Sequence, residues 1–152
     1  MKQHLISLVL FFSFLLSGCM PLKQTEVTSP NGHIRLAFAL DGNNRMTYQV
    51  SVGDTVCITS SLLGFTAKDG VNLAEGFKVI NTDFTTHDET WTQPWGENKN
   101  IRNHYNEMAV HLSDTTNTKL TLRFRIFDDG LGFRYEYEVP GADSILVTDE
   151  LT

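Results

Sequence analysis

The chain has 152 residues, of which 18 are acidic and 12 are basic, so its formal charge is −6 at pH 7. A surface of this sign does not attract nucleic acid or an anionic membrane, and no nucleic-acid partner is expected. Because only two cysteines are present, a disulfide framework is excluded as well. A neutral, hydroxyl-rich ligand suits this charge better.

The first 18 residues have the features of a lipoprotein signal peptide. Lys2 supplies the positive start, and residues 5–16 form an apolar run that ends in the motif Leu-Ser-Gly-Cys. In such a motif the cysteine, here Cys19, becomes the acylated first residue. An ordinary signal peptide or a membrane-spanning anchor would begin in the same way, but twelve residues are short for a bilayer. We expect lipidation at Cys19, followed by a polar tether over residues 19–29.

Alternating apolar and polar residues predict strands directly after the tether. Residues 34–40 and 46–52 each place every second side chain on one apolar face, and residues 41–44 predict the turn that joins them into a hairpin. A third strand is expected around Val56 to Thr59. Cys57 lies in this apolar run and is predicted to be a small buried hydrophobe.

The rest of the chain shows the same period of two. Phe65, Phe77 and Val79 continue the sheet, and three further strands are expected at residues 108–112, 120–126 and 133–139. Residues rich in Asp, Asn, Thr and Gly separate these strands and predict turns. No segment has the period of an amphipathic helix. The pattern therefore predicts an all-β fold, an antiparallel β-sandwich.

The segment from Asp88 to Glu107 interrupts this pattern, because it follows neither a strand nor a helix period. We interpret it as a long polar loop. Trp91 and Trp95 offer flat apolar faces, and nearby side chains offer hydrogen-bond donors and acceptors, namely Glu97, Arg102, Asn103, His104 and Asn106. This mixture suits the apolar patches and hydroxyls of a sugar ring. In the alternative interpretation, Trp91, Trp95 and Tyr105 pin a long connection onto the sheet.

Four blocks of the sequence resemble a known family. They are SPNGHIRLAFAL at residues 29–40, GFTAKDGVNLAEGF at 64–77, the segment at 88–107, and FRIFDDGLGFRYEYEVP at 124–140. In this order they resemble the N-terminal domain of glycoside hydrolase family 97, which contains bacterial α-glucosidases and α-galactosidases. The resemblance implies a galactose-mutarotase-like sandwich, followed in longer members by a catalytic (β/α)8 barrel and a small β domain. Residues 30–152 would then be a partial N-terminal domain with incomplete sheets.

The resemblance also implies which chemistry lies elsewhere. The catalytic carboxylates of the family belong to the barrel, and its active-site calcium is held mainly there. No residue of this chain is therefore expected to be catalytic, and no calcium ligand is assigned. Asp128 and Asp129 are interpreted as a turn between strands. His87, Asp88 and Glu89 are not expected to bind a metal, because consecutive residues of an extended chain point in opposite directions.

In the resembled family, loops of the sandwich pack against the barrel and help to wall its active-site pocket. The candidates for this role, or for the domain interface, are Trp91, Trp95, Glu97, Arg102, Asn103 and Tyr105. The first functional hypothesis is a non-catalytic N-terminal portion of a secreted lipoprotein α-glycosidase, with the barrel and α-linked oligosaccharides as partners. The second is a free-standing carbohydrate-binding surface lipoprotein, and the third is a structural domain without a ligand. The family further implies the periplasm or outer membrane of a Gram-negative bacterium, with Cys19 as the anchor.

Overall fold

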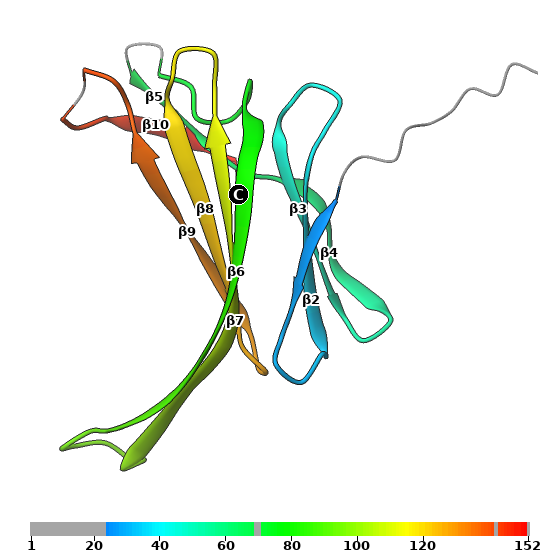
Figure 1. Cartoon of the computed structure of the whole chain (residues 1–152), viewed down its shortest axis with the longest axis vertical. Helices are drawn as coiled ribbons and strands as arrows, with labels where there is room; N and C mark the ends of the chain where they lie inside the picture. Colours follow the sequence, from blue (N-terminus) through cyan, green and yellow to red (C-terminus); the bar gives the residue numbers. More distant parts are fainter. Residues whose placement is uncertain (1–23, 69–70, 142, 152) are drawn as a thin grey trace, which may run out of the picture.

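The computed structural model describes residues 24–68, 71–141 and 143–151, which consist almost entirely of antiparallel strands and their turns (Figure 1). The predicted signal peptide and Cys19 lie outside the described residues. Within these ranges no helix has the length and apolar character needed to cross a membrane. The prediction of an all-β antiparallel fold is confirmed.

The first sheet contains four strands in the order β1-β2-β3-β4. They are β1 (Thr25–Thr28), β2 (Ile34–Leu40), β3 (Met46–Val52) and β4 (Thr55–Leu62). β2 and β3 have the predicted bounds, because each strand buries one face and therefore needs an apolar residue at every second position. β1 corrects the predicted tether of residues 19–29. Residues 25–28 pair with β2 because Val27, opposite Leu36, reaches the core.

The second sheet has the order β6-β7-β8-β9 and forms the other layer of the sandwich (Figure 1). Its strands are β6 (Lys78–Thr92), β7 (Asn100–Ser113), β8 (Lys119–Ile126) and β9 (Leu131–Glu138). Each strand pairs with the next one along the chain, so the sheet is a simple meander. A small third sheet pairs β5 (Phe65–Ala67) with β10 (Val147–Glu150).

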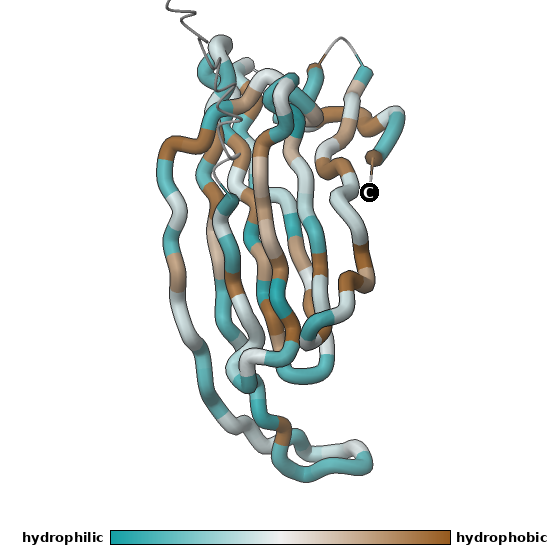
Figure 2. Tube along the Cα trace, turned by 90° about the vertical axis from the view of Figure 1, so that its right-hand side faces the viewer, coloured by the Kyte–Doolittle hydropathy of each residue, from teal (hydrophilic) through white to brown (hydrophobic). Residues whose placement is uncertain are grey.

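The core fills the space between the two large sheets. β2 and β3 supply side chains such as Phe38 and Met46, and β7 and β8 supply Val110 and Phe124. The rings of Phe38 and Phe124 meet across the layers with centroids 6.2 Å apart. Figure 2 shows apolar and polar positions alternating along the strands. The large side chains with almost no exposure are Phe38, Phe77, Phe124, Leu36, Met46, Leu63, Leu73, Met108, Leu120, Leu122, Ile126 and Val110.

Hydrogen bonds fasten the two layers at one end of the sandwich. The backbone amide of Asn31, in the turn between β1 and β2, donates to Asp128 Oδ1 at 2.8 Å. The side-chain amide of Asn106 on β7 donates to the Thr28 carbonyl of β1 at 2.9 Å. Asp128 therefore has a structural role, since it holds the turn after β8 against the first sheet.

Cys57 is exposed, so the prediction of a buried position was wrong. It lies on β4, an edge strand, where the register with β3 shifts between the pairs Val50–Ile58 and Ser51–Val56. Cys57 is the extra residue of this bulge and leaves the regular alternation of the strand. The predicted third strand itself is present.

The segment from Asp88 to Glu107 is not a loop, because most of it belongs to β6 and β7. β8 pairs with β7 only as far as Asn106, so residues 87–105 continue as a two-stranded arm beyond the sandwich (Figures 1 and 2). Most side chains of this arm are exposed on both faces. Because neither face of the arm is buried, its residues do not alternate between apolar and polar, and the strands could not be recognised from the sequence.

Candidate functional site

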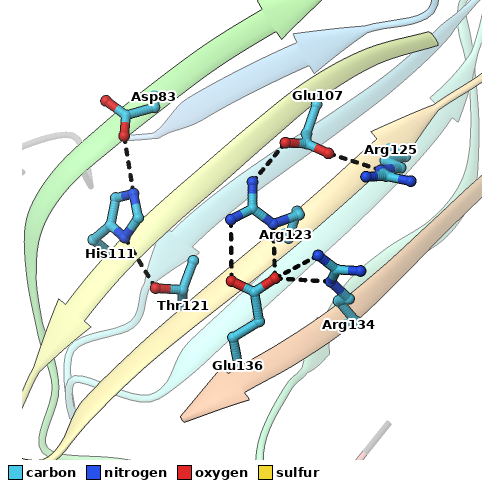
Figure 3. A network of polar contacts seen from close by, with 8 residues as sticks. All are labelled: Asp83, Glu107, His111, Thr121, Arg123, Arg125, Arg134 and Glu136. Atoms are coloured by element: carbon cyan, nitrogen blue, oxygen red, sulfur yellow. Dashed lines mark hydrogen bonds and ion pairs between the residues drawn. The ribbon is translucent and has the colours of Figure 1, made fainter. Parts of the chain in front are cut away.

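The outer face of the second sheet, opposite the core, is polar. The even-numbered side chains of β7 and β8 enter the core, so the odd-numbered ones point outward. Together with their neighbours on β6 and β9 they form a surface that we call the polar face (Figure 3). Its defining residues are Asp83, Tyr105, Glu107, His111, Thr121, Arg123, Arg125, Arg134 and Glu136.

Ion pairs form a continuous ladder across the polar face. Glu107 is only 8% exposed and accepts hydrogen bonds from Arg123 Nη1 at 2.6 Å and Arg125 Nε at 2.7 Å. Arg123 binds Glu136 through Nε and Nη2, at 2.9 and 3.0 Å. Glu136 also accepts a hydrogen bond from Arg134 Nε at 2.8 Å. The ladder thus joins β7, β8 and β9, and its cations outnumber its anions.

The ladder keeps both of its carboxylates ionised. The hydrogen bond from Arg123, assisted by one from Arg134, lowers the pKa of Glu136 from 4.5 to about 2 against the opposing effect of burial. Burial favours a higher pKa for Glu107, but the hydrogen bonds from Arg125 and Arg123 outweigh it and lower that pKa. Neither carboxylate therefore carries a proton to donate at neutral pH.

A separate hydrogen-bonded chain links β6, β7 and β8. His111 Nδ1 lies 2.9 Å from Thr121 Oγ1, and His111 Nε2 lies 3.0 Å from Asp83 Oδ2 (Figure 3). A hydroxyl, an imidazole and a carboxylate in sequence also occur in hydrolase triads. Thr121, however, lies in a strand that is paired on both sides. The backbone amides around it are used in the hydrogen bonds of the sheet and do not form an oxyanion hole. We assign a structural role to this row of three hydrogen-bonded side chains.

An aromatic cluster joins the polar face to the arm. The rings of His87 and Tyr105 stack with centroids 5.0 Å apart, and the Arg125 guanidinium lies 4.6 Å from the centre of the Tyr105 ring. Phe127 also contacts Tyr105, at 5.2 Å between centroids. These contacts bury Tyr105 and fix the base of the arm. Beside the cluster, Arg125, Phe127 and Arg134 line a depression of about 210 Å³.

The far end of the arm carries both tryptophans. Trp95 lies in the turn between β6 and β7 and is 85% exposed, while Trp91 on β6 is 48% exposed. The Gln93 side chain donates to the Asn98 carbonyl at 2.7 Å and closes the turn. The interpretation in which three aromatic residues pin this segment to the sheet is therefore wrong for both tryptophans and holds for Tyr105 alone.

Strand alternation separates the six predicted site residues. Asn103 and Tyr105 lie on the same side of β7 as the polar face. Arg102 lies on the opposite side and donates from Nε and Nη2 to Asp88, at 2.9 and 2.8 Å. Glu97 is exposed in the turn. The six residues therefore occupy two faces and the tip of one arm, and they do not converge on a single pocket.

The ladder is the feature that sequence reasoning missed. Arg123 and Arg125 occupy alternate positions of a predicted strand, which indicates only that they point outward. Their partner becomes visible through the register of β7 and β8, which places Glu107 directly opposite Arg125. Charged residues at alternate positions of neighbouring strands indicate that ion pairs can form between the strands. Which residues pair can be predicted only when the register of the strands is known.

The residues considered for metal binding are used in other contacts. His87 stacks on Tyr105 and lies 3.1 Å from Glu89 Oε1, whereas Asp88 binds Arg102 on the other face of the strand. Among the described residues, no group of three or more His, Cys, Asp and Glu side chains is placed to hold a metal ion. These residues do not fit the calcium that the family resemblance implies, and we derive no step through a metal.

Replacing Glu107 with glutamine tests the ladder. Arg123 and Arg125 would lose their shared carboxylate in a poorly solvated position, so we expect the free energy of unfolding to fall by about 3 kcal/mol. Urea denaturation followed by circular dichroism measures this change. Glu138→Gln is the matched control, because the exposed pair of Glu138 with Lys119 contributes less than about 0.5 kcal/mol. Similar losses in both variants would contradict the role of the ladder.

The low pKa of Glu136 predicts a pH dependence of stability. This pKa is 4.5 ordinarily and about 2 in the folded protein, so ionised Glu136 stabilises the fold above pH 4.5 and stops doing so as the pH falls toward 2. Because the side chain is 38% exposed, solvent screening limits the contribution to about 1 kcal/mol. In urea unfolding, the difference between the unmodified protein and Glu136→Gln should shrink over this pH range. A difference that is independent of pH would argue against it.

Comparison with known proteins shows what the chain is similar to. Residues 27–152 match the family described as Glycosyl-hydrolase 97 N-terminal. The retaining alpha-galactosidase of Bacteroides thetaiotaomicron is 26% identical over 113 residues, which are 74% of this chain and 16% of that protein. A family 97 enzyme of Pseudoalteromonas sp. strain K8, solved with panose, superposes with a TM-score of 0.78 at 30% identity, over 84% of this chain and 20% of that one. A beta-arabinopyranosidase gives a TM-score of 0.75 at 25% identity, with 84% and 20% covered.

The matched residues include the arm, β10 and both large sheets except the first two residues of β1. They also include the four sequence blocks on which the resemblance depends. The chain spans 20% of the length of these solved relatives, so the match concerns their N-terminal part and not their whole activity. The chain belongs to the family of N-terminal domains of glycoside hydrolase family 97.

Proposed function

We propose that this chain is the non-catalytic N-terminal portion of a longer family 97 glycosidase, in which it supports a (β/α)8 barrel and lines part of its active site. The arm carries this proposal. It leaves the sandwich and exposes Trp91 and Trp95, and large exposed apolar side chains of this kind mark interaction sites. The family membership of the chain favours the catalytic barrel as the partner that covers them.

Docking of the arm would be energetically favourable. Burying one tryptophan side chain removes roughly 150 to 250 Å² from water at about 25 cal/mol per Å², which corresponds to about 4 to 6 kcal/mol. The arm is already a paired hairpin with a hydrogen-bonded turn. Because its backbone is ordered beforehand, little conformational entropy is lost on docking. A rigid arm is therefore suited to reach across a domain boundary.

The arm also has groups that recognise α-linked oligosaccharides. The indole faces of Trp91 and Trp95 suit the apolar faces of sugar rings, while Glu97 and Asn103 offer hydrogen-bonding groups for hydroxyls. The Pseudoalteromonas relative was solved in complex with panose and with acarbose. We infer that the tip contributes to the sugar-binding wall of the assembled protein.

We assign catalysis to the barrel, as the family resemblance implies, and the two carboxylates of the ladder support this assignment because both are occupied. Glycoside hydrolysis requires one protonated and one ionised carboxyl group beside the scissile bond. Glu107 and Glu136 are each held by two arginines and have lowered pKa values, so neither suits a general acid. Asp128 accepts the Asn31 amide.

A chimera tests the supporting role. Residues 27–152 of this chain would replace the matching segment of the Pseudoalteromonas enzyme, and the kcat/KM for panose would be measured. We expect the chimera to be active and Trp95→Ala to lower its kcat/KM by about tenfold or more, because the tip loses its packing against the barrel or the sugar. Val56→Ala, at a position 47% exposed on β4, is the control and should leave kcat/KM unchanged.

Calorimetric titration of the isolated chain tests the second candidate function, free-standing carbohydrate binding. A chain that binds sugar by itself should release heat when titrated with panose or acarbose, and Trp95→Ala should abolish that heat. The exposure of Trp95 at the tip is the observation that favours this alternative. An active chimera that is insensitive to Trp95→Ala, combined with sugar binding by the isolated chain, would replace the supporting role with free-standing carbohydrate binding.

We further propose that Cys19 anchors the protein to a membrane. The support is the Leu-Ser-Gly-Cys motif that follows the apolar run of residues 5–16. In a Gram-negative host, Cys19→Ser should move the protein from the membrane fraction to the soluble fraction on immunoblots. Cys57→Ser is the matched control and should stay in the membrane fraction. Unchanged membrane association of Cys19→Ser would contradict lipidation.

A further inference from the structure

Gly132 occupies a position in β9 where the fold does not require a glycine. It pairs with Arg125 of β8 in a regular register, so it does not form a bulge. Its φ is not positive, so no turn depends on it. Apart from its chain neighbours, no heavy atom of the described residues lies within 4 Å of a Cβ added there. Glycine weakens a strand, and inside a regular strand it often marks a place where another molecule approaches closely.

The absent side chain leaves a positively charged depression on the polar face. Its volume is about 210 Å³, and it is lined by Arg123, Arg125, Phe127, Gly132, Phe133 and Arg134. The three arginines share only the two carboxylates of Glu107 and Glu136 (Figure 3). The depression therefore has an excess of positive charge, although the chain as a whole carries −6. Such a local field favours an anionic group.

Arg125 is held in a fixed orientation beside Gly132. Its Nε donates to Glu107 at 2.7 Å, and its guanidinium lies 4.6 Å from the centre of the Tyr105 ring. The side chain is nevertheless 40% exposed. Its two Nη groups make no hydrogen bond to any residue that the structure describes. A guanidinium that is ordered beforehand and keeps both Nη donors available suits a carboxylate, which can accept two parallel hydrogen bonds from it.

The place of Arg125 within the sheet determines the direction from which an anion can approach. β8 is paired on both sides, with Glu107 of β7 and Gly132 of β9 directly opposite Arg125. A further strand beyond β9 would lie about 10 Å from β8, because neighbouring strands are about 4.8 Å apart. A carboxylate therefore reaches Arg125 from above the polar face. This conclusion does not depend on how many strands the sheet contains.

The arm places an apolar side chain on the same side of the sheet. Trp91 lies opposite Ile101, and strand alternation puts both on the side of Tyr105 and of the polar face. Trp91 is 48% exposed. Figure 1 shows the arm bending away from the first sheet, toward the outer side of the second sheet. A partner that lies in this bend would contact Trp91 and cover Arg125 at the same time.

We propose that this partner presents the carboxylate of an aspartate or glutamate to Arg125, above Gly132. The inference rests on the proposed function, because it takes the partner to be the catalytic barrel. A neutral partner would cover the excess guanidinium charge without replacing its hydration, which is unfavourable. An acidic side chain supplies charge-assisted hydrogen bonds instead. The contact would also fix the orientation of the two domains, since complementary charges select one docked arrangement.

Filling the space above Gly132 tests this contact. Gly132→Val introduces a side chain that a strand accepts, so the urea midpoint of the isolated chain should not fall. In the chimera described above, the same change should lower kcat/KM for panose by about tenfold, because the valine keeps the carboxylate away from Arg125. Gly42→Val is the matched control, because Gly42 also has open space around it but lies in the turn between β2 and β3. It should leave kcat/KM unchanged.

Cross-linking identifies the partner group directly. In the chimera, Arg125→Lys provides an amine that a carbodiimide joins to a nearby carboxylate as an amide, while the carbodiimide takes up water and becomes a urea. Peptide mass mapping should find residue 125 linked to an aspartate or glutamate of the barrel, in addition to Glu107. Arg45→Lys is the matched control, since Arg45 also contacts a carboxylate of its own chain, at 2.7 Å. It should link to Asp41 alone.

The outcomes distinguish this inference from the proposed function. A folded chimera that is inactive, or indifferent to Trp95→Ala, would overturn both. A chimera that is sensitive to Trp95→Ala but not to Gly132→Val, with residue 125 linked to Glu107 alone, would overturn the carboxylate contact and leave the supporting role intact. A lower urea midpoint of the isolated chain with Gly132→Val would mean that the glycine serves the fold, and would also overturn the contact.

Discussion

The burial of one face of each large sheet against the other is the constraint on which the rest of the structure depends. On β8, Leu122 and Phe124 enter the core, and Arg123 and Arg125 consequently point outward. A shift of one residue would exchange these two sets, so the core determines the register of β8 against β7. The position of every polar group on the outer face follows from this register. The polar face is thus organised by the apolar face behind it.

The ion-pair ladder illustrates this dependence. A carboxylate as covered as Glu107 costs several kcal/mol in lost hydration unless charged donors replace the water. Arg123 and Arg125 supply these donors, but only because the core holds them within 2.7 Å of the two carboxylate oxygens. The ladder therefore favours one strand register over the others, and this effect is larger than its contribution to net stability. Its use of both glutamates also explains why the polar face is ill suited to acid–base chemistry.

The two surfaces with unsatisfied apolar groups have a common origin in β6. This strand is longer than the strands that could cover it, so beyond Asn106 the hairpin continues as a free arm, and along its length one edge has no neighbour among the described strands. The arm exposes Trp91 and Trp95, and the edge exposes Ile80 and Phe84. Exposed apolar side chains are unfavourable in water when no partner covers them. Both surfaces are therefore candidates for contact with a partner. The partner that we propose for the tip is the catalytic barrel or a sugar.

The alternation of apolar and polar residues was sufficient for the all-β class and for the strands at residues 34–40 and 46–52, and the resemblance of four sequence blocks was sufficient for the family. In these strands a single buried face requires an apolar residue at every second position, so the strands can be recognised from the local sequence. The arm lacked this signature because both of its faces meet solvent, and Cys57 departed from it because a bulge in an edge strand breaks the alternation. Which polar groups meet was decided only in the folded chain. Arg102 and Asn103 are adjacent in the sequence but lie on opposite faces, whereas residues far apart in the sequence become partners through the register of their strands. Register is a long-range property set by the packing of two sheets, and no local stretch of sequence contains it.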